Sequence, residues 1–460
     1  MPRGFESHAL RATADTTTDG RSPVNDELRP TSRRAAKSPS VARHGRLKRH
    51  SLWKTLAKGA ASVLAVVMVS GVSVAAYAAM NLVQTAKPTV TLDSEKVLEG
   101  VPDIGAIDGG VNLLLIGSDS REGQGDGFGD PDEETAVLND VTMLLHISQD
   151  HTHAEVISFP RDMLVSVPEC TDPEDPEDTL SALSSVKINT VLSYGGMDCV
   201  VKTVSNELGI TIPFAGVVQF LGVAGLSEAV GGVQVCVAER IEDEHTDLYL
   251  DPGVQELRGL QALQFLRTRH GVGDGSDLGR ISNQQVFMSA LARKVQSDGT
   301  LTDPVKLFGI AKAALANMQL SSALANPTTM VSIAKAMQDI DLSKLAFIQY
   351  PTSYVEGGGA LEPDWRAESV NLALQQDVPV VLPTEQDSPF SSVADPNAPP
   401  PAEAPVEEAP VEEPPAEEAP AEEAPPADTT APAPGVVLEG VPGQTAADVR
   451  CSAGRTLDDQ

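Results

Sequence analysis

Three arginines, Arg267, Arg269 and Arg280, surround a glycine-rich segment that also carries Asp274 and Asp277. A guanidinium group presents a planar set of donors that matches pairs of phosphate oxygens, so arginines gathered around a flexible segment indicate an anion site. Arg280 is predicted to begin a helix, and helix N-termini attract anions as well. The segment lacks the βαβ context of a dinucleotide fingerprint and the remaining ligands of an EF-hand. We therefore expect a phosphate-containing ligand here.

Polar residues also gather where three apolar runs begin or end. They are Asp119 and Arg121 after residues 112–117, Asp140 before residues 141–147, and Arg161 and Asp162 after residues 155–159. Residues at strand ends of α/β folds commonly face the ligand crevice. Two neighbouring carboxylates suit Mg²⁺, which keeps several waters and takes phosphate oxygens as further ligands. Each patch taken alone also fits an ordinary turn or a surface ion pair, so both interpretations stay open at this point.

Strands alternating with helices are predicted over much of the chain. Strands are expected at residues 112–117, 141–147, 155–159, 217–220, 233–237 and 346–350, and helices at 199–208, 221–230, 259–268, 279–295, 304–318, 328–337 and 368–374. This alternation predicts an α/β or α/β/α layered domain. The apolar stretches 220–224 and 260–266 could line a slot for a lipid tail, and core packing is their alternative role.

The chain has no charged residue between Gly59 and Ala86, a run longer than the roughly 20 residues that cross a bilayer. The first 58 residues hold 13 Lys or Arg and five Asp or Glu. The positive-inside rule then predicts a single-pass protein of the cell membrane with a cytoplasmic N-terminus and with residues 87–460 outside the cytoplasm. A cleaved signal peptide is the alternative, but its basic and apolar regions would ordinarily be shorter.

Beyond residue 58 the chain carries 20 Lys or Arg and 60 Asp or Glu, a net charge of about −40. This excludes nucleic acid as a partner, because phosphate backbones bind basic surfaces. The four cysteines lie on the predicted outer side, where disulfides persist, and four cysteines allow three pairings. We favour Cys170 with Cys199, which leaves Cys236 for Cys451. The spacing fits no zinc site.

The composition changes sharply along the chain and predicts six parts. These are a disordered basic arm over 1–58, a transmembrane helix over 59–82, a connector over 83–110, a folded domain over 111–383, a disordered Pro/Ala/Glu-rich spacer over 384–436 and a segment with Cys451 over 437–460. Proline and repeated like charges keep the spacer extended and leave it too little apolar surface to fold alone.

Five segments, taken in order, resemble the LytR-CpsA-Psr proteins of the actinobacterial type. They are NLLLIGSDSR, LNDVTMLLHI, VISFPRDMLVSVP, KINTVLSYGG and FLRTRHGVGDGSDLGRISNQQ, and the resemblance covers about residues 111–350. It implies an α/β/α domain with a central mixed β-sheet. It also implies an enzyme that uses Mg²⁺ (or Mn²⁺) to transfer a glycopolymer from an undecaprenyl-pyrophosphate carrier to peptidoglycan, forming a phosphodiester bond at the membrane lipid surface.

The resemblance also implies roles for individual residues. The metal-binding aspartates would be Asp119 and Asp140, and the pyrophosphate-binding residues would be Arg121, Arg161, Arg267, Arg269, Arg280 and Gln284, with Asn189 also on a motif position. We expect Arg161, Asp162, Arg267 and Arg269 to be catalytic, with Asp162 accepting the hydroxyl proton. Leu138 and Asn283 stand where many members have arginine, so this site carries less positive charge.

Two other functions use the same residues. One is a non-catalytic cell-wall regulator that binds polyprenyl pyrophosphate, and the other is a pyrophosphatase that releases the polymer to water. A water acceptor and a sugar acceptor would need the same arginines and metal, so residue types alone do not separate these functions.

Overall fold

The computed structural model describes residues 52–85, 87–101, 104–107, 109–124, 137–297, 299–300, 303–383, 392–394 and 435–460. Most of the predicted basic arm and most of the predicted Pro/Ala/Glu-rich spacer lie outside the described residues.

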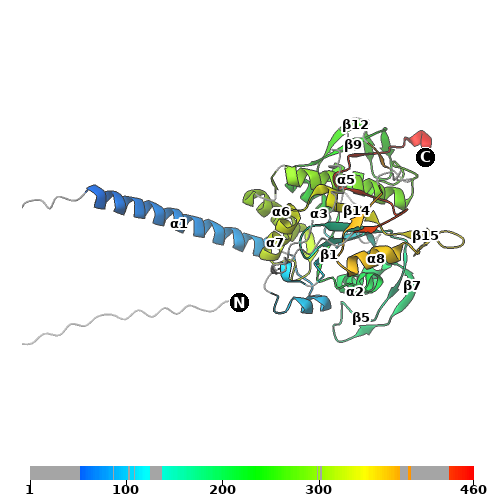
Figure 1. The fold of residues 1–460 in the computed structure, drawn as a ribbon, viewed down its shortest axis with the longest axis horizontal. Helices are drawn as coiled ribbons and strands as arrows, with labels where there is room; N and C mark the ends of the chain where they lie inside the picture. The colour runs from blue at the N-terminus through cyan, green and yellow to red at the C-terminus, as the bar shows by residue number, and fades with distance from the viewer. Residues whose placement is uncertain are drawn as a thin grey trace, which may run out of the picture. The chain divides into compact units, whose positions relative to one another are not determined.

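Helix α1 spans Leu52–Thr85 and is drawn in blue in Figure 1. Thirty-four residues rising 1.5 Å each give a helix of about 50 Å, more than the roughly 30 Å of a bilayer's hydrocarbon core. Its stretch Trp53–Gly71 is long and apolar enough to cross a membrane. The predicted span at residues 59–82 falls within α1, and its orientation stays a prediction.

A mixed sheet forms the centre of the domain. Among the described residues its strands follow the order β13 (Met318–Leu320), β8 (Phe214–Val218), β1 (Val111–Ser118), β2 (Asn139–Ile147), β3 (Ala154–Phe159), β14 (Leu345–Gln349) and β20 (Gly443–Thr445). The pairs β1–β8 and β3–β14 are parallel, and the other four are antiparallel. The predicted α/β fold with a central mixed sheet is thereby confirmed.

Helices cover both faces of this sheet, as Figure 1 shows. They are α2 (Val191–Leu208) and α8 (Ala367–Gln375) on one face, and α6 (Pro304–Asn317) and α7 (Pro327–Gln338) on the other. Alternate residues of a strand point to opposite faces, so β1 supplies both layers. Leu114 and Ile116 are buried with α2 and α8, whereas Val111 and Leu113 are buried with α6 and α7.

A second, smaller sheet holds the helices that carry the arginines. Its order is β12 (Gly253–Leu257), β9 (Val233–Val237), β21 (Arg450–Ser452) and β18 (Ser392–Ala394). The associated helices are α3 (Phe220–Ala229), α4 (Gly259–Arg267) and α5 (Asp277–Ser297). Phe265 of α4 and Phe287 of α5 are buried together with Val235 of β9 in one apolar cluster. The predicted strand at residues 217–220 is displaced, because β8 ends at Val218 and α3 begins at Phe220.

Short two-stranded pairs complete the domain. They are β4 (Leu164–Val167) with β7 (Leu183–Lys187), β5 (Cys170–Thr171) with β6 (Thr179–Leu180), β10 (Ile241–Asp243) with β11 (Leu248–Leu250), β15 (Thr352–Tyr354) with β16 (Leu361–Pro363), and β17 (Val380–Val381) with β19 (Val436–Val437). A short 3₁₀ helix, η4 (Ile188–Thr190), links β7 to α2.

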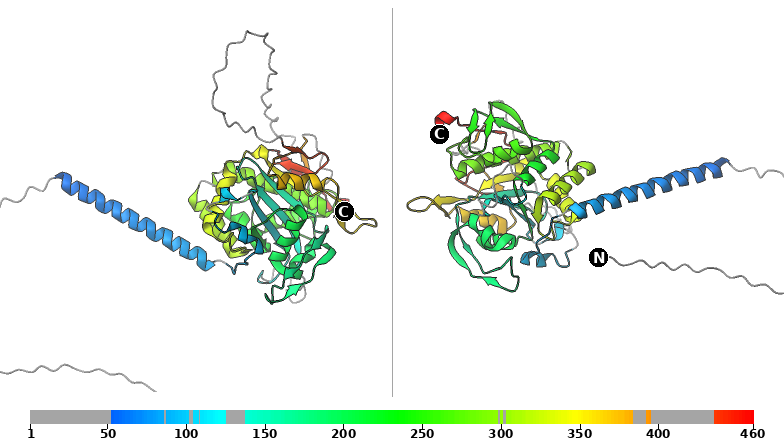
Figure 2. Two further views of the ribbon diagram at one scale, coloured as in Figure 1. Left: turned by 60° about the horizontal axis from the view of Figure 1, so that its bottom comes forward. Right: turned by 180° about the vertical axis from the view of Figure 1, so that it is seen from behind.

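Both disulfides follow the pairing favoured from the sequence, with Cys170 bonded to Cys199 and Cys236 bonded to Cys451. The second bond fastens strand β21 to strand β9, which run parallel. The C-terminal segment, drawn in dark orange to red in Figure 2, also supplies β20 to the central sheet. Residues beyond the predicted boundary at 383 are therefore part of the folded domain.

Candidate active site

The strand pairing brings three of the polar patches to one end of the central sheet. Strand β1 ends where β2 begins, with Ser118 opposite Asn139, and β2 begins beside the end of β3, with Thr142 opposite Phe159. Asp119, Asp140 and Arg161 therefore leave the sheet at the same end.

Asp119 is fixed by the residue that precedes β2. Its backbone N–H donates to the Leu138 carbonyl at 3.1 Å, and its Oδ1 accepts from the Leu138 N–H at 2.6 Å. Burial raises the pKa of the Asp119 carboxyl, the Leu138 N–H opposes that rise, and the negative charge of Asp140 adds to it. Arg121 is close enough to stabilise the Asp119 carboxylate and to disfavour the charge on Arg267. Leu138 thus fixes Asp119 through its backbone carbonyl and N–H, and not through its side chain.

Asp140 lies among three arginines. Arg161 Nη1 donates to its Oδ1 at 2.8 Å, and Arg269 Nη2 lies 4.0 Å from the same oxygen. Arg280 Nη2 donates to the Asp140 backbone carbonyl at 2.5 Å. Strand β2 is thereby joined to the segment after β3 and to both arginine-bearing helices.

The segment after β3 is held from two sides. Arg161 donates its backbone N–H to Asp277 Oδ2 at 3.1 Å, and its Nε lies 3.5 Å from Asp162 Oδ2. Lys187 of β7 donates to the other oxygen of Asp162 at 2.8 Å. Burial would raise the pKa of Asp162, but the hydrogen bond from Lys187 and the charge of Arg161 outweigh it and lower that pKa.

Helices α4 and α5 present the other arginines through the connecting segment, which we call the arginine loop (residues 267–280). The Arg267 guanidinium lies over the ring of Phe220 at 4.2 Å, a cation–π contact that orients it. Arg269 Nη2 lies 3.6 Å from Asp277 Oδ1, and Arg280 Nη2 lies 2.7 Å from the same oxygen. Burial is the main cause that lowers the pKa of both Arg267 and Arg269, yet a guanidinium stays protonated in proteins.

Asp243 of β10 holds the start of the arginine loop through hydrogen bonds to Thr268 and Arg269. This carboxylate is fully buried, and its Oδ2 accepts from the Thr268 hydroxyl at 2.5 Å and from the Arg269 N–H at 3.3 Å. Its Oδ1 accepts from the His245 N–H at 2.9 Å. Burial would raise the pKa of Asp243, but these hydrogen bonds and one from the Gly271 backbone lower it.

Gln284 and Asn283 lie one turn along α5 and face the protein interior. Gln284 donates to the Leu266 carbonyl at 2.9 Å and Asn283 to the Phe265 carbonyl at 2.8 Å, so both join α5 to the last turn of α4. Asn283 is fully buried and also accepts from the Ser452 hydroxyl. Gln284 thus joins α5 to the end of α4, and its contact with pyrophosphate stays a prediction.

Asn189 of η4 donates its backbone N–H to the Arg161 carbonyl at 3.2 Å, and its side-chain Oδ1 is buried without a hydrogen-bond partner. It therefore lies beside the Arg161 segment, and its amide oxygen can accept a hydrogen bond.

The sequence did not point to the groups that position the arginines. Asp277 was visible only as part of the glycine-rich segment, yet it accepts from Arg161 and pairs with Arg269 and Arg280. Asp243 and Lys187 lie on short strands with no motif of their own. Burying a carboxylate costs free energy unless the group is paired or hydrogen-bonded. An aspartate within a predicted buried strand is therefore the one sequence signal that could have singled out Asp243.

Asp119 and Asp140 fit a divalent cation of the Mg²⁺ type. The negative charge of Asp140 adds to the rise in the pKa of Asp119, and a bound cation would oppose that rise. The described residues contain no group of three or more His, Cys, Asp or Glu suited to hold a metal.

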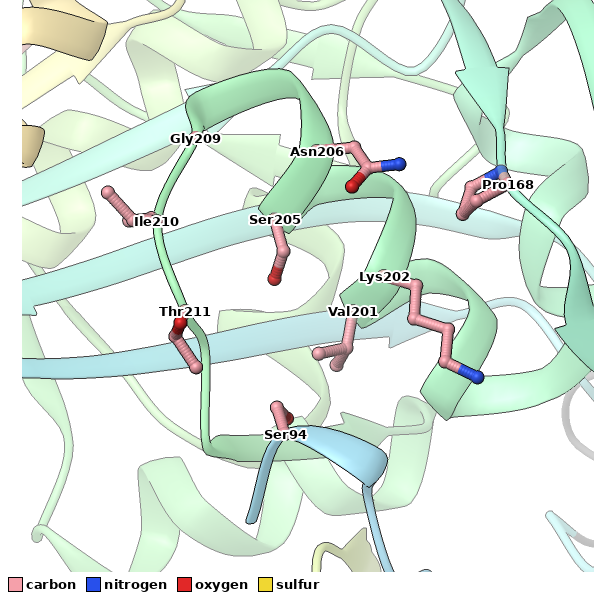
Figure 3. Close-up of a pocket in the computed structure, with 9 residues that line it drawn as sticks. All are labelled: Ser94, Pro168, Val201, Lys202, Ser205, Asn206, Gly209, Ile210 and Thr211. Carbon is pink, nitrogen blue, oxygen red and sulfur yellow. The ribbon is translucent and has the colours of Figure 1, made fainter. Parts of the chain in front are cut away.

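A separate depression of about 500 Å³ lies away from these residues and is shown in Figure 3. It is lined by Ser94, Pro168, Val201, Lys202, Ser205, Asn206, Gly209, Ile210 and Thr211. Lys202 is already paired there with Asp93 at 2.7 Å and with Asp198 at 2.9 Å. The predicted lipid-slot stretches instead form the first half of α3 and most of α4, where Phe220, Leu263 and Phe265 are buried and Leu221 and Leu260 are exposed.

The family model described as LytR_cpsA_psr family matches residues 69–370, more than half of the chain. The chain belongs to this family. It is 29% identical over 285 residues to the cell wall biosynthesis protein LcpA of Corynebacterium glutamicum, covering 56% of this chain and 53% of the relative. It is 26% identical over 263 residues to the polyisoprenyl-teichoic acid–peptidoglycan teichoic acid transferase TagT of Bacillus subtilis, covering 55% of this chain and 75% of that protein.

Among solved structures, the crystal structure of B. subtilis TagV is similar to this LytR_cpsA_psr protein with a TM-score of 0.45 and 24% identity, covering 58% of this chain and 96% of that one. The chain spans about half the length of the Corynebacterium relative it matches.

Proposed function

We propose that this protein is a membrane-anchored phosphotransferase that attaches a glycopolymer, carried on polyprenyl pyrophosphate, to peptidoglycan through a phosphodiester bond. The proposal places the catalytic domain outside the cytoplasm, anchored by α1. The family membership and the transferase activity for which the TagT relative is named support the class of reaction.

One observation carries the proposal for this chain. Five arginines (Arg121, Arg161, Arg267, Arg269 and Arg280) and two aspartates (Asp119 and Asp140) converge from four segments of a domain that is otherwise strongly acidic. Such a concentration of positive charge in acidic surroundings suits a small, highly charged anion, and pyrophosphate carries that charge at the point where a lipid carrier joins its glycan.

The bond exchange needs positioning and charge neutralisation more than covalent chemistry by the protein. A sugar hydroxyl of peptidoglycan attacks the glycan-linked phosphorus, and the bond from that phosphorus to the bridging oxygen breaks. Polyprenyl phosphate leaves with the electron pair, and the hydroxyl proton is released. Arg267 and Arg269 would bind the phosphate that leaves, and Arg161 the phosphate that is transferred, because donors fixed in advance stabilise developing charge efficiently.

Asp119 and Asp140 would hold Mg²⁺ or Mn²⁺, and a bound ion would neutralise charge on the pyrophosphate oxygens. Asp119 is held for this by its two hydrogen bonds to Leu138, and Asp140 by Arg161 and Arg280. Chelation should lower the affinity for a pyrophosphate ligand as well as the rate.

Asp162 is better suited to a positioning role than to the proton-accepting role expected from the sequence. A carboxylate whose pKa is lowered by Lys187 and Arg161 is a weaker base than an ordinary aspartate. Its salt bridges instead hold the Arg161 side chain and the β7 strand together.

The test uses the full chain in detergent micelles with Mg²⁺, a short lipid-pyrophosphate-linked glycan and uncrosslinked peptidoglycan. Mass spectrometry should detect glycan joined to muropeptide by a phosphodiester, and this product should be lost in Asp119→Ala and Arg267→Ala. Free phosphorylated glycan as the main product would instead indicate a pyrophosphatase. Binding of the lipid pyrophosphate without any product would favour the non-catalytic regulator.

A further inference from the structure

The end of the chain reaches the arginines. After strand β20 joins the central sheet, the segment that we call the C-terminal arm (residues 450–455) crosses the second sheet as β21. None of the sequence motifs includes the arm.

The arm pairs with the backbone of the arginine loop. The Gly273 N–H donates to the Ala453 carbonyl at 3.0 Å, and the Arg455 N–H donates to the Gly271 carbonyl at 2.8 Å. Val272 and Gly454 form an antiparallel bridge between these two bonds. The glycines that follow Arg269 are therefore ordered as a strand-like segment by the arm.

The arm also holds helix α5, which carries Arg280. The Ser452 hydroxyl donates to Asn283, and the Asn283 amide donates to the Phe265 carbonyl near the end of α4. All three residues are buried. The Asn283 side chain thus joins the arm to both helices that bear arginines.

The Cys236–Cys451 disulfide and the close packing of Gly454 against the backbone restrict the conformation of the arm. Cys451 is bonded to Cys236 across 215 residues of chain, next to the loop contacts. A Cβ atom at Gly454 would lie 2.1 Å from the Glu239 carbonyl oxygen and 2.5 Å from that of Arg240, so the arm passes directly over this backbone. Three-residue strands such as β21 and β18 contribute few hydrogen bonds, which makes the disulfide the strongest link between the arm and the domain.

We propose that the C-terminal arm is a positioning element for the pyrophosphate site, held in place by the Cys236–Cys451 disulfide. Its purpose is to set the backbone of the arginine loop so that Arg269 and Arg280 converge with Arg267. The proposal rests on the proposed function for the identity of the ligand. The Cys170–Cys199 disulfide joins β5 to α2, and in this proposal it does not position the arginine loop.

The two disulfides offer matched variants for the test. Full-length Cys236→Ser/Cys451→Ser and Cys170→Ser/Cys199→Ser proteins would be compared with wild type in detergent micelles. Hydrogen–deuterium exchange would follow the amides of residues 268–276, and calorimetry would measure the affinity for inorganic pyrophosphate with Mg²⁺. Ser452→Ala, which keeps both disulfides, is a milder probe in case the first variant fails to fold.

In the Cys236/Cys451 variant we expect faster amide exchange in the arginine loop and an affinity for pyrophosphate at least tenfold weaker. A displacement of functional groups by about 1 Å can reduce an enzyme's rate on the order of 100-fold, and a displaced arginine should weaken binding for the same geometric reason. Ser452→Ala should shift both quantities in the same direction by less. The Cys170/Cys199 variant should lose thermal stability but keep wild-type affinity and loop exchange.

Two results would overturn the proposal. One is unchanged pyrophosphate affinity in the Cys236/Cys451 variant although its loop exchanges faster. The other is the same loop exchange in both disulfide variants. If wild type itself binds no pyrophosphate, the proposed ligand is wrong, and the exchange data alone still decide whether the arm orders the loop.

Discussion

Replacing Asp243 with asparagine should release the start of the arginine loop while changing the shape of the side chain very little. The carboxylate is fully buried and accepts from the Thr268 hydroxyl, the Arg269 N–H and the His245 N–H. An asparagine amide keeps one acceptor oxygen and turns the other into a donor. Whichever way it is oriented, at least one backbone N–H then faces an NH₂ group.

The magnitude follows from these bonds. A hydrogen bond to a charged group contributes about 1.5–3 kcal/mol and a neutral one about 1 kcal/mol, so losing the charge costs roughly 0.5–2 kcal/mol at each bond that the asparagine oxygen keeps. An unsatisfied buried N–H adds about 1–3 kcal/mol. We expect the free energy of unfolding to fall by about 2–5 kcal/mol, and transfer activity to fall further, because the loop that Asp243 holds carries Arg269.

Urea unfolding of the full chain in micelles measures this difference, with Asp251→Asn as the matched control. Asp251 pairs with Arg240 at the surface, so its loss should cost less than about 1 kcal/mol. The pKa of Asp243 is lowered in the folded state, so its contribution is present above about pH 4 and is lost as the pH falls through the folded value. A difference below 1 kcal/mol at neutral pH, or one that grows as the pH falls, would refute the reasoning.

Three further predictions concern the charge, the metal and the pH dependence. Arg269→Ala should reduce transfer to background but shift the thermal midpoint by only a few degrees. The side chain is partly exposed, and its carboxylate partners Asp277 and Asp140 lie 3.6 and 4.0 Å away. Full transfer activity in this variant would show that Arg269 is not part of the site. Calorimetric titration should show Mg²⁺ or Mn²⁺ binding that Asp119→Ala abolishes, and equal binding by both proteins would place the metal elsewhere. His153 and Glu155 are a buried pair 3.0 Å apart; burial would lower the pKa of His153, but Glu155 outweighs it and raises that pKa. The stability that wild type holds over His153→Gln should therefore be complete below about pH 6.5 and fade as the pH rises through the folded value, which urea unfolding from about pH 5 to about pH 9 measures. A wild-type advantage that increases with pH would contradict this assignment.

Local patterns were sufficient for the elements that build the central sheet. The apolar runs at residues 112–117, 141–147 and 155–159 fall within β1, β2 and β3, and their polar neighbours meet because adjacent strands share one end of the sheet. The arginine-bearing helices were also visible, since α4 has one apolar face and a glycine-rich break separates it from α5. These features depend on residues close together in sequence, where periodicity is informative.

The positioning contacts could not be predicted because they join distant parts of the chain. Asp243 reaches Thr268, and Ser452 reaches Asn283 across 169 residues. Gln284 illustrates the consequence, because its motif position suggested a ligand contact, whereas its amide bonds to the Leu266 carbonyl. Short strands such as β20 carry too few residues for any alternation to stand out.

The outermost position of the central sheet, beside β14, is filled by residues 443–445 of strand β20. Until residues 443–445 have been synthesised, β14 is an unpaired edge with open backbone donors and acceptors. Such edges template pairing with other chains, so a nascent polypeptide is exposed to aggregation until residues 443–445 emerge, and a chain that terminates before them stays exposed. A stop codon anywhere in the Pro/Glu-rich stretch would thus leave every motif residue intact and still yield a product prone to self-association.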